Sequence, residues 1–491
     1  MRNRVWCDRF LAPLCLLCAM VFSAPIQASP WAEVGDNQLR SDVEILAAAG
    51  VVDDITTHWP LPWTSLVADI RADKSLAEQP GYVRAAAERV MREARAQTEG
   101  GMQASVFLDA TNHPDTVYGF DGMGRGDGEA QFSLQYNSGG TSARLSLGAI
   151  TQSFQGRSVK IMPEGTYFAQ KVGGALVYGG YLSHWWGPGW ISALALSNNA
   201  RPMPQIGIER LDTSAFDLPV LRWLGPWQGE FLVGLLDGPR INSNTFYNAL
   251  RFTFNPAPGL EIGLARTEEF CGQGHPCAPL RDYFDFRNDP THVDKTNDEG
   301  LIDVKYSSVI SGVPTQIYLQ VMNEDSSPIS HSITSHLFGG TVFVPTRADP
   351  VRLTLEYTDS VPTVDIFSFG DVLHGAAYTN GSYPDGMRYR GRTLGFSLDS
   401  DSRLLSLQGG WSDAHGVFYE LSLHHADISN PNNPDGNVVT TVPVIVNMGE
   451  ARVTLPLRIF KLDLALRLQD DQPRPQKGFA ATFESAIRIG L

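Results

Sequence analysis

The sequence lacks several features that mark common protein classes. After the N-terminal segment, no run of about 18 apolar residues could form a transmembrane helix. Basic residues are too few for a nucleic-acid-binding protein, because 38 Lys and Arg stand against 53 Asp and Glu and form no basic cluster. The G-x-S-x-G, P-loop and H-E-x-x-H motifs are absent. The sequence therefore marks no catalytic residue by a known motif, and we expect none.

Residues 1–28 have the pattern of a secretory signal peptide. Arg2, Arg4 and Arg9 accompany an apolar run over residues 10–22, and small residues follow up to Ala28. A lipoprotein signal fits less well, because a leucine precedes Cys18. We predict that residues 1–28 are removed. This removal takes away three arginines and one aspartate and changes the net charge from −15 to −17.

Cysteine is scarce in the exported part of the chain. Three of the five cysteines lie in the predicted signal peptide, which leaves Cys271 and Cys277 in the segment CGQGHPC. Two nearby cysteines in an exported protein predict a local disulfide. A zinc site is not expected, since His275 adds a third ligand and no fourth lies nearby.

Residues 29–100 are predicted to form a small helical bundle. Asp36 can cap a helix that carries Leu39, Val43 and Leu46 on one face and stops at Gly50. The segment WPLPW (59–63) predicts a rigid turn between this helix and two further ones, which end before residues 99–101. A structural plug or spacer is the favoured role, and a partner-docking module is the alternative.

After residue 100 the spacing of apolar residues changes from a helical period of 3.6 to a strand period of 2, and it stays so to residue 491. In VRLTLEYTDS (351–360), for example, Val351, Leu353 and Leu355 alternate with polar residues, and similar segments recur to the C-terminus. Dyads of about ten residues separated by polar loops are typical of an outer-membrane β-barrel. The length favours about 16–18 antiparallel strands. A secreted soluble β-protein is the alternative.

Four polar, aromatic segments are predicted to be long extracellular loops. They cover residues 112–129, 271–299, 362–391 and 427–441. Leu491 differs from the aromatic residue that usually ends such barrels. The adjacent His424 and His425 are expected to face opposite sides of a strand, so they cannot form one site.

Half of the ten tryptophans lie between residues 185 and 227. Aromatic faces stack on the C–H faces of sugars, so this cluster is a candidate carbohydrate platform. Tightly packed turns and membrane-interface residues are the alternatives. The residues alone leave these possibilities open.

Four segments in this region occur in a characteristic order: HWWGPGW (184–190), NARPMPQI (199–206), LRWLGPWQGE (221–230) and RFTFNPAPGLEIGLAR (251–266). Together they closely resemble the Wzi-type capsule assembly proteins of Gram-negative outer membranes. Residues 37–63 and 374–399 resemble further parts of that family. The resemblance implies an 18-stranded barrel with a periplasmic helical bundle. It also implies a non-enzymatic, lectin-like function without a cofactor.

The partners that the resemblance implies are capsular or other surface polysaccharide, outer-membrane lipid and lipopolysaccharide, and the capsule export machinery. Residues of the tryptophan motifs and of the Tyr- and Arg-rich 374–399 segment become candidates for polysaccharide binding. These candidates are His184, Trp185, Trp186, Arg201, Arg222, Trp223, Tyr378, Tyr383, Arg388 and Arg390. For the tryptophan corner at 185–190, a structural role that borders the glycan surface is favoured.

Two other functions stay open at this point. A porin or transport channel requires an open lumen, which planar-bilayer conductance would detect. An outer-membrane hydrolase requires a Ser–His pair brought together in space, and nothing in the sequence marks one.

Overall fold

The computed structural model describes most of the 491-residue chain. The described residues are 30–53, 55–98, 100–152, 158–277, 296–324, 333–346, 349–364, 371–430, 437–457 and 460–490. Residues 1–28 lie outside them, so the signal peptide stays a prediction. Parts of the predicted loops, including residues 278–295, also lie outside.

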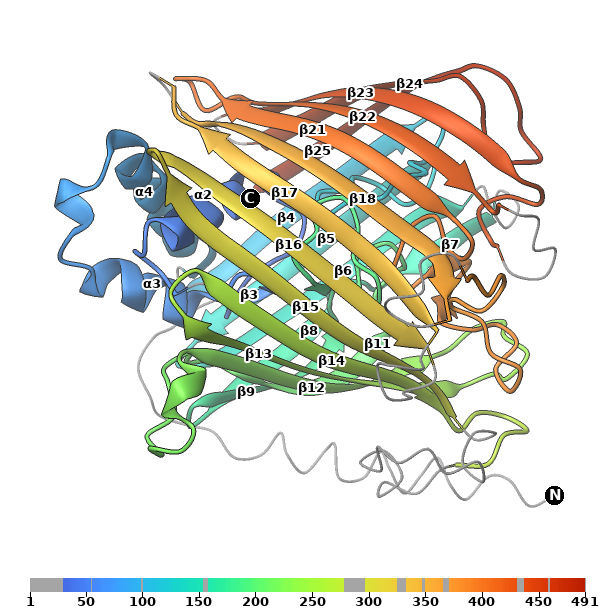
Figure 1. Cartoon of the computed structure of the whole chain (residues 1–491), viewed down its shortest axis with the longest axis horizontal. Coiled ribbons are helices and arrows are strands. Elements are labelled where there is room, and N and C mark those ends of the chain that lie inside the picture. The colour runs from blue at the N-terminus through green and yellow to red at the C-terminus, as the bar shows by residue number, and fades with distance from the viewer. Residues whose placement is uncertain are drawn as a thin grey trace.

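Three α-helices occupy the N-terminal part of the described chain: α2 (Asn37–Ala48), α3 (Trp63–Ala72) and α4 (Gly81–Thr98), with a short 3₁₀ helix η2 (Leu76–Glu78) between the last two. The Asp36 carboxylate accepts a hydrogen bond from the Leu39 N–H at 2.9 Å, which confirms the predicted cap. The helices gather at one end of the molecule (Figure 1). None of the described helices has the length and apolar character that a membrane span requires.

The remaining chain is a closed antiparallel barrel. Nine strand positions run away from the helices: β4 (Gly101–Thr111), β6 (Thr141–Gln152), β9 (Ala175–Tyr181), β12 (Trp227–Leu236), β14 (Leu260–Phe270), β16 (Val313–Glu324), β18 (Val351–Thr363), β22 (Phe418–Ile428) and β24 (Phe460–Gln469).

Nine positions run back: β5 (Gly128–Ser138), β7 with β8 (Ser158–Met162 and Tyr167–Val172), β11 (Pro204–Arg210), β13 (Thr245–Ala257), β15 (Thr296–Ile310), β17 (Thr334–Val344), β21 (Arg403–Ser412), β23 (Val444–Leu457) and β25 (Ala480–Gly490).

Pairing between the last and first strands closes the barrel, with Ala486 opposite Asp109. The segments β7 and β8 both pair with β6, so together they occupy one strand position. The barrel therefore has 18 positions, at the upper limit of the number expected from the sequence.

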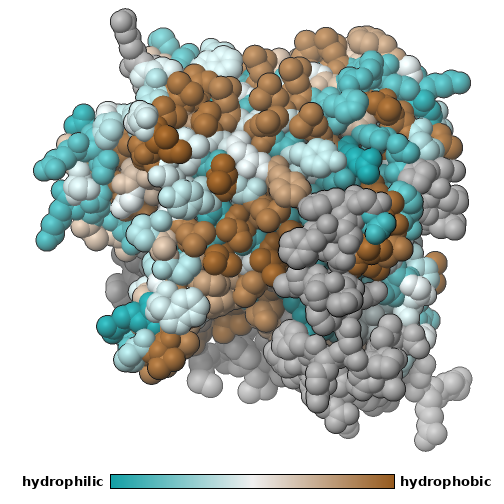
Figure 2. All heavy atoms as spheres, viewed as in Figure 1, coloured by the Kyte–Doolittle hydropathy of each residue, from teal (hydrophilic) through white to brown (hydrophobic). Residues whose placement is uncertain are grey.

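The two faces of the wall have opposite character. In β18, Leu353 and Leu355 are 44 % and 56 % exposed on the outside, whereas Glu356 is buried on the inside. The same alternation along the other strands covers much of the outer face with apolar side chains (Figure 2). His424 faces inward and His425 faces outward, as predicted. An apolar outside and a polar inside are characteristic of barrels that sit in lipid.

The connections between strands differ at the two ends of the barrel. At the end that carries the helices, which we call the helix end, most turns are short, such as residues 139–140, 258–259 and 311–312. At the opposite end, the loop end, they are long. Two connections differ from this pattern. Residues 182–203 leave β9 and fold into the lumen, and residues 211–226 form an unusually long connection at the helix end.

Candidate functional site

The tryptophan corner lies inside the barrel. Trp185 and Trp186 form the short strand β10, which pairs antiparallel with β2 (His58–Trp59). The strand β2 belongs to the described part of residues 30–63, which we call the N-terminal segment. Trp59, Trp185 and Trp186 are each fully buried. Phe120, from another loop, meets the rings of Trp59 and Trp185 edge-on at 5.0 and 5.6 Å. The N-terminal segment and the inward loop 182–203 therefore form one aromatic core in the lumen.

The N-terminal segment also contributes two further short strands. In it, β1 (Trp31–Ala32) pairs with β3 (Leu61–Pro62). The predicted WPLPW turn is thus part of the lumen packing. Trp31 donates from its Nε1 to the Glu209 carboxylate on β11, which joins this segment to the wall.

Arg40 on α2 binds the Gly-Pro-Gly turn (187–189) of the tryptophan motif. Its guanidinium donates to the carbonyls of Pro188 and Gly189 at 2.8 and 2.9 Å and lies 4.3 Å from the ring centroid of Trp190. Gly187 has φ 142°, and a Cβ there would lie 2.4 Å from the Gln320 amide. Glycine is favoured here because residues with a side chain rarely adopt this φ, and a Cβ would displace the Gln320 amide. The motif is therefore built for tight packing against the helix and the wall.

The backbone of the inward loop is mostly outside any strand, so its N–H and C=O groups need other hydrogen-bond partners. Side chains of the barrel wall supply them. The Glu356 carboxylate on β18 accepts the N–H groups of Trp190 and Ser192 at 2.8 and 2.7 Å. Gln320 on β16 donates to the Trp186 carbonyl and accepts from the Leu194 N–H, both at 2.9 Å. These bonds hold the inward loop against the wall.

His184 belongs to this packing as well. The Glu230 carboxylate on β12 contacts Nε2 of His184 and Nε2 of His58, each at 3.0 Å, and all three groups are buried. Arg201, at the other end of the inward loop, pairs with the buried Glu164. Four of the ten candidate residues, His184, Trp185, Trp186 and Arg201, thus lie in the lumen and expose almost no surface.

The lumen keeps a cavity of about 200 Å³ beside β4 to β6. Polar side chains including Arg144, Glu33 and Glu164 line it. Residues 374–402 of the connection between β18 and β21 form what we call the 374–402 loop. The inward loop, the N-terminal segment and part of the 374–402 loop occupy other parts of the lumen, since Tyr378 Oη donates to the Leu194 carbonyl at 2.5 Å. The described barrel is thus a filled one.

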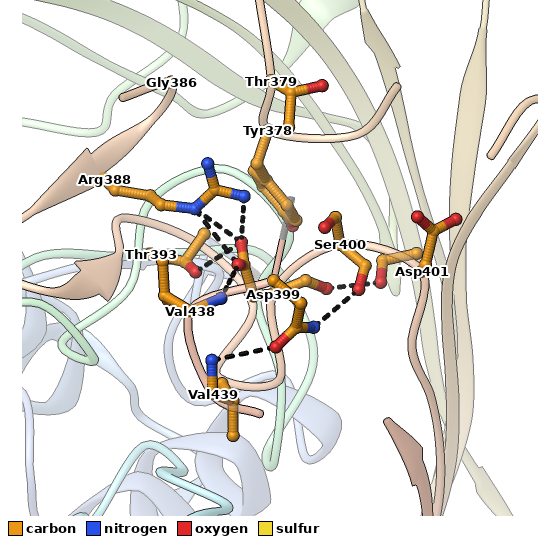
Figure 3. Close-up of polar contacts among 12 residues, drawn as sticks. Tyr378, Thr379, Gly386, Arg388, Thr393, Asp399, Ser400, Asp401, Val438 and Val439 are labelled. Atoms are coloured by element: carbon orange, nitrogen blue, oxygen red, sulfur yellow. Dashed lines mark hydrogen bonds and ion pairs between the residues drawn. The ribbon is translucent and has the colours of Figure 1, made fainter. Parts of the chain in front are cut away.

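The loop between β18 and β21 is organised around one carboxylate (Figure 3). Asp399 accepts from Arg388 Nε and Nη2 at 3.0 and 2.9 Å, from Thr393 Oγ1 at 2.9 Å and from the Val438 N–H at 2.8 Å. Arg388 lies on β19 (Arg388–Tyr389), and Thr393 lies on β20 (Arg392–Thr393). Val438 belongs to the β22–β23 loop, so Asp399 joins two loops.

Three of the four candidate residues in this loop are buried. Tyr378 and Tyr383 have no exposed surface, and Arg388 is 7 % exposed. Tyr378 has φ 59°, and its N–H donates to the Glu324 carboxylate at 2.8 Å. Arg390 is more open and pairs with Asp237 of the β12–β13 loop at 3.0 Å. The buried residues position the loop, and Arg390 reaches its surface.

The predicted disulfide between Cys271 and Cys277 is present. It closes a small loop that contacts the 374–402 loop, because Tyr383 Oη donates to the Cys271 carbonyl at 3.1 Å. The His275 ring stacks on Tyr383 with centroids 4.5 Å apart.

Three loops therefore converge at the loop end. Besides the contacts above, Asn242 Nδ2 donates to the Ser382 carbonyl at 2.8 Å, and the Ile241 N–H donates to Asp385 at 2.6 Å. We define the loop-end rim by six partly exposed polar residues of these loops: Asp237, Asn242, His275, Asn380, Asp385 and Arg390.

Of the rim residues, only Arg390 is among the sugar-binding candidates that the sequence predicts. The segment DGPRINSN (237–244) is a recognisable turn, but nothing in it shows which loop it meets.

Arg222 and Trp223 lie at the other end of the barrel. They belong to the 3₁₀ helix η3 (Arg222–Leu224) in the long helix-end connection, and Trp223 is 64 % exposed on the outside. The ten candidate residues thus form three separate groups, in the lumen, at the loop end and at the helix end. They do not form a single site.

The described residues bear on two kinds of chemistry, metal binding and Ser–His hydrolysis. No group of three His, Cys, Asp or Glu side chains there is placed to hold a metal ion. Among the described residues, Ser406 Oγ lies 2.7 Å from His424 Nδ1. Both side chains are buried in the wall, facing the filled lumen.

Comparison with known proteins gives a consistent set of relatives. The sequence profile of the family "Capsule assembly protein Wzi" matches residues 97–467. A Klebsiella pneumoniae protein described as an uncharacterized 55.8 kDa protein in the cps region is 25 % identical over 315 residues, which cover 62 % of this chain. The matched region spans only 60 % of that relative's length.

Among solved structures, Escherichia coli Wzi is similar, with a TM-score of 0.79 and 20 % identity over 93 % of this chain and 99 % of that one. That protein is described as an outer-membrane, carbohydrate-binding β-barrel involved in group 1 capsule assembly. Pseudomonas aeruginosa OprD matches with a TM-score of 0.45 and 10 % identity, covering 81 % and 97 % of the two chains.

Proposed function

The chain belongs to the Wzi family of capsule assembly proteins, and on this premise we propose that it is a non-enzymatic outer-membrane lectin that binds surface polysaccharide at its loop-end rim. Short turns of outer-membrane barrels face the periplasm and long loops face outward. In this orientation the helix end lies in the periplasm and the rim faces the medium, where a surface polymer is present.

The observation that carries the proposal is the convergence of three loops on a filled barrel. Asp237, Asn242 and Asn380 offer carboxylate and amide groups that hydrogen-bond sugar hydroxyls. Arg390 adds a positive charge for acidic sugars, and the ring of His275 adds a face for stacking. The Asp399 cluster and the disulfide loop hold these groups in place, which lowers the entropic cost of binding.

Eight of the ten sequence candidates acquire a role in this proposal, and Arg222 and Trp223, at the helix end, acquire none. Arg390 contacts polysaccharide, whereas Tyr378, Tyr383 and Arg388 position the loop. His184, Trp185, Trp186 and Arg201 maintain the lumen packing that supports it. The outer face contacts outer-membrane lipid and lipopolysaccharide, and the helix end is the surface available to the export machinery.

The direct test is binding of purified full-length mature protein to capsular polysaccharide from its own host strain, measured by co-sedimentation. Arg390→Ala should weaken binding about tenfold, which corresponds to about 1.4 kcal/mol. Arg390→Lys should retain part of the affinity for an acidic polymer. Lys74→Ala, an exposed charge change at the helix end, is the matched control. Absence of binding by the unmodified protein to host capsular polysaccharide or exopolysaccharide would overturn the proposal.

A further inference from the structure

The helix-end connection between β11 and β12, residues 211–226, differs from its neighbours. Other connections at that end whose bounds are described cover a few residues, such as 173–174 and 413–417. This one is much longer and carries three strongly exposed apolar side chains. Leu218 is 62 % exposed, Val220 81 % and Trp223 64 %. Polysaccharide binding at the opposite end gives these residues no role.

The exposure is a property of an ordered segment. The Trp227 N–H donates to the Thr213 carbonyl at 2.8 Å, which closes the base of the loop. The Asn255 N–H on β13 donates to the Pro226 carbonyl at 2.9 Å. Gly225 has φ 66°, and a Cβ there would lie 1.9 Å from the Asn255 carbonyl oxygen. The backbone at Gly225 therefore packs directly against β13.

The apolar side of the segment continues the outer face of the barrel. Trp223 meets Phe254 edge-on, with centroids 6.3 Å apart, and Phe254 in turn adjoins Phe252 on the outward face of β13. Phe216 stacks on Trp227 at 4.3 Å. Tyr306, two strands away on β15 and near the same end, is also exposed. The segment therefore lies where the apolar belt meets the helix end.

Polar groups border this apolar surface. Arg222 and Asp217 are exposed beside Trp223 and Leu218, and the Arg210 guanidinium lies 3.9 Å above the Trp227 ring. Tryptophan flanked by a long basic side chain suits the boundary between acyl chains and headgroups, because the indole has an apolar body and a polar N–H. At the centre of a protein–protein interface, fewer charged residues would be expected around these apolar side chains.

We propose that residues 211–226 form a lipid-interface anchor, in which Leu218, Val220 and Trp223 enter the periplasmic leaflet at the headgroup boundary. Arg222 then reaches the phosphate groups of the lipid. This inference rests on the barrel spanning a membrane, but it does not depend on polysaccharide binding. The anchor fixes the depth and tilt of the barrel on the side of β11 to β13.

Site-directed spin labelling in vesicles of phosphatidylethanolamine and phosphatidylglycerol tests this proposal. After removal of residues 1–28, the only native cysteines form the 271–277 disulfide, so an introduced cysteine is the single reactive thiol. Labels are placed by Val220→Cys and Trp223→Cys. Leu407→Cys, on the outward face of β21, serves as the lipid reference, and Lys74→Cys serves as the water reference.

Collision of the label with oxygen and with a water-soluble nickel chelate distinguishes the outcomes. We expect the oxygen-to-nickel ratio at positions 220 and 223 to exceed that at 74 at least threefold and to approach that at 407. A ratio equal to that at 74 would overturn the anchor. Dipolar broadening that disappears when the protein is diluted in lipid would instead indicate contact with a second copy and would also overturn it.

Loss of the lipid signal at position 407 would mean that the barrel does not span the bilayer, which contradicts the membrane premise and the anchor together. Failure of polysaccharide binding alone leaves the label ratios unchanged. The two proposals therefore fail by different measurements.

Discussion

Trp185 pairs directly with Trp59 inside the barrel, although one residue follows β9 and the other precedes α3. Each side chain is fully buried, and Phe120 contacts both rings. This pair joins the N-terminal segment to the inward loop. The loop in turn contacts the 374–402 segment through Tyr378. A continuous series of packed segments thus extends from the helices through the lumen to the loop end.

Replacing the neighbouring tryptophan tests whether this core is structural. Trp186→Ala should destabilise the protein by about 3–5 kcal/mol, because it removes a fully buried indole from a packed interior. Thermal unfolding and heat-dependent gel mobility measure the effect. Phe479→Ala removes an aromatic ring that is 70 % exposed and should change stability by less than about 0.5 kcal/mol. A fully stable Trp186→Ala barrel that lost only polysaccharide binding would instead identify Trp186 as a sugar contact.

The filled lumen leads to a prediction about conductance. The unmodified protein in a planar bilayer should show no steady, porin-sized conductance, since the N-terminal segment and the inward loop occupy the barrel. Arg40→Ala removes the bonds to Pro188 and Gly189 and should produce brief openings. Lys74→Ala, at an exposed position, should behave like the unmodified chain. A large and steady current through the unmodified protein would favour the transport-channel alternative.

Acid should weaken the junction between α2 and the barrel. Burial acts to raise the pKa of the Asp36 carboxyl, but the Lys461 ion pair and the Leu39 N–H outweigh it and lower this pKa to about 2. Because the folded-state pKa lies below the ordinary value of 3.8, the stabilisation is complete above about pH 4. It is lost as the pH falls from about 4 to 2.

Asp36→Asn keeps a good helix cap but removes this charge. The variant should be less stable than the unmodified protein at pH 6, by no more than about 1 kcal/mol for a partly exposed pair, and equal to it near pH 2. Thermal unfolding across this pH range measures the difference. A difference that persists at pH 2 would show that the Asp36 charge is not responsible.

Much of the fold is predictable because its signals are local. Alternation in segments such as 351–360 reflects a wall with lipid on one side and polar groups on the other. The Asp36 cap and the cysteine pair are also local, and the structure confirms both. The strand number follows from length, and the family resemblance refines it to 18.

The candidate site was harder to predict because its residues are arranged by long-range packing. Trp186 and Trp223 are near in sequence, but the strand β11 runs between their segments and carries the chain toward the opposite end of the barrel. A sequence pattern also does not show that residues 182–203 fold inward. The rim residues Asp237 and Asn242 meet the 374–402 loop only through tertiary contacts.

Asp399 provides the sharpest test of how the loop end is held together. Asp399→Asn should break a buried ion pair with Arg388 and weaken the bond to the Val438 N–H. Breaking a buried pair costs about 3–5 kcal/mol, so the loop should open locally while the barrel persists. Hydrogen exchange should increase over residues 374–402 and stay unchanged in β13 and β14. Affinity for the host polysaccharide should fall at least tenfold.

Asp371→Asn is the matched control, because Asp371 is an exposed carboxylate of the same connection. It should leave both hydrogen exchange and affinity unchanged. If Asp399→Asn also left the exchange of residues 374–402 unchanged, the carboxylate would not organise the loop. If exchange increased while affinity stayed constant, the rim would not need a fixed loop for binding, and the contribution of preorganisation to the proposed lectin function would be excluded.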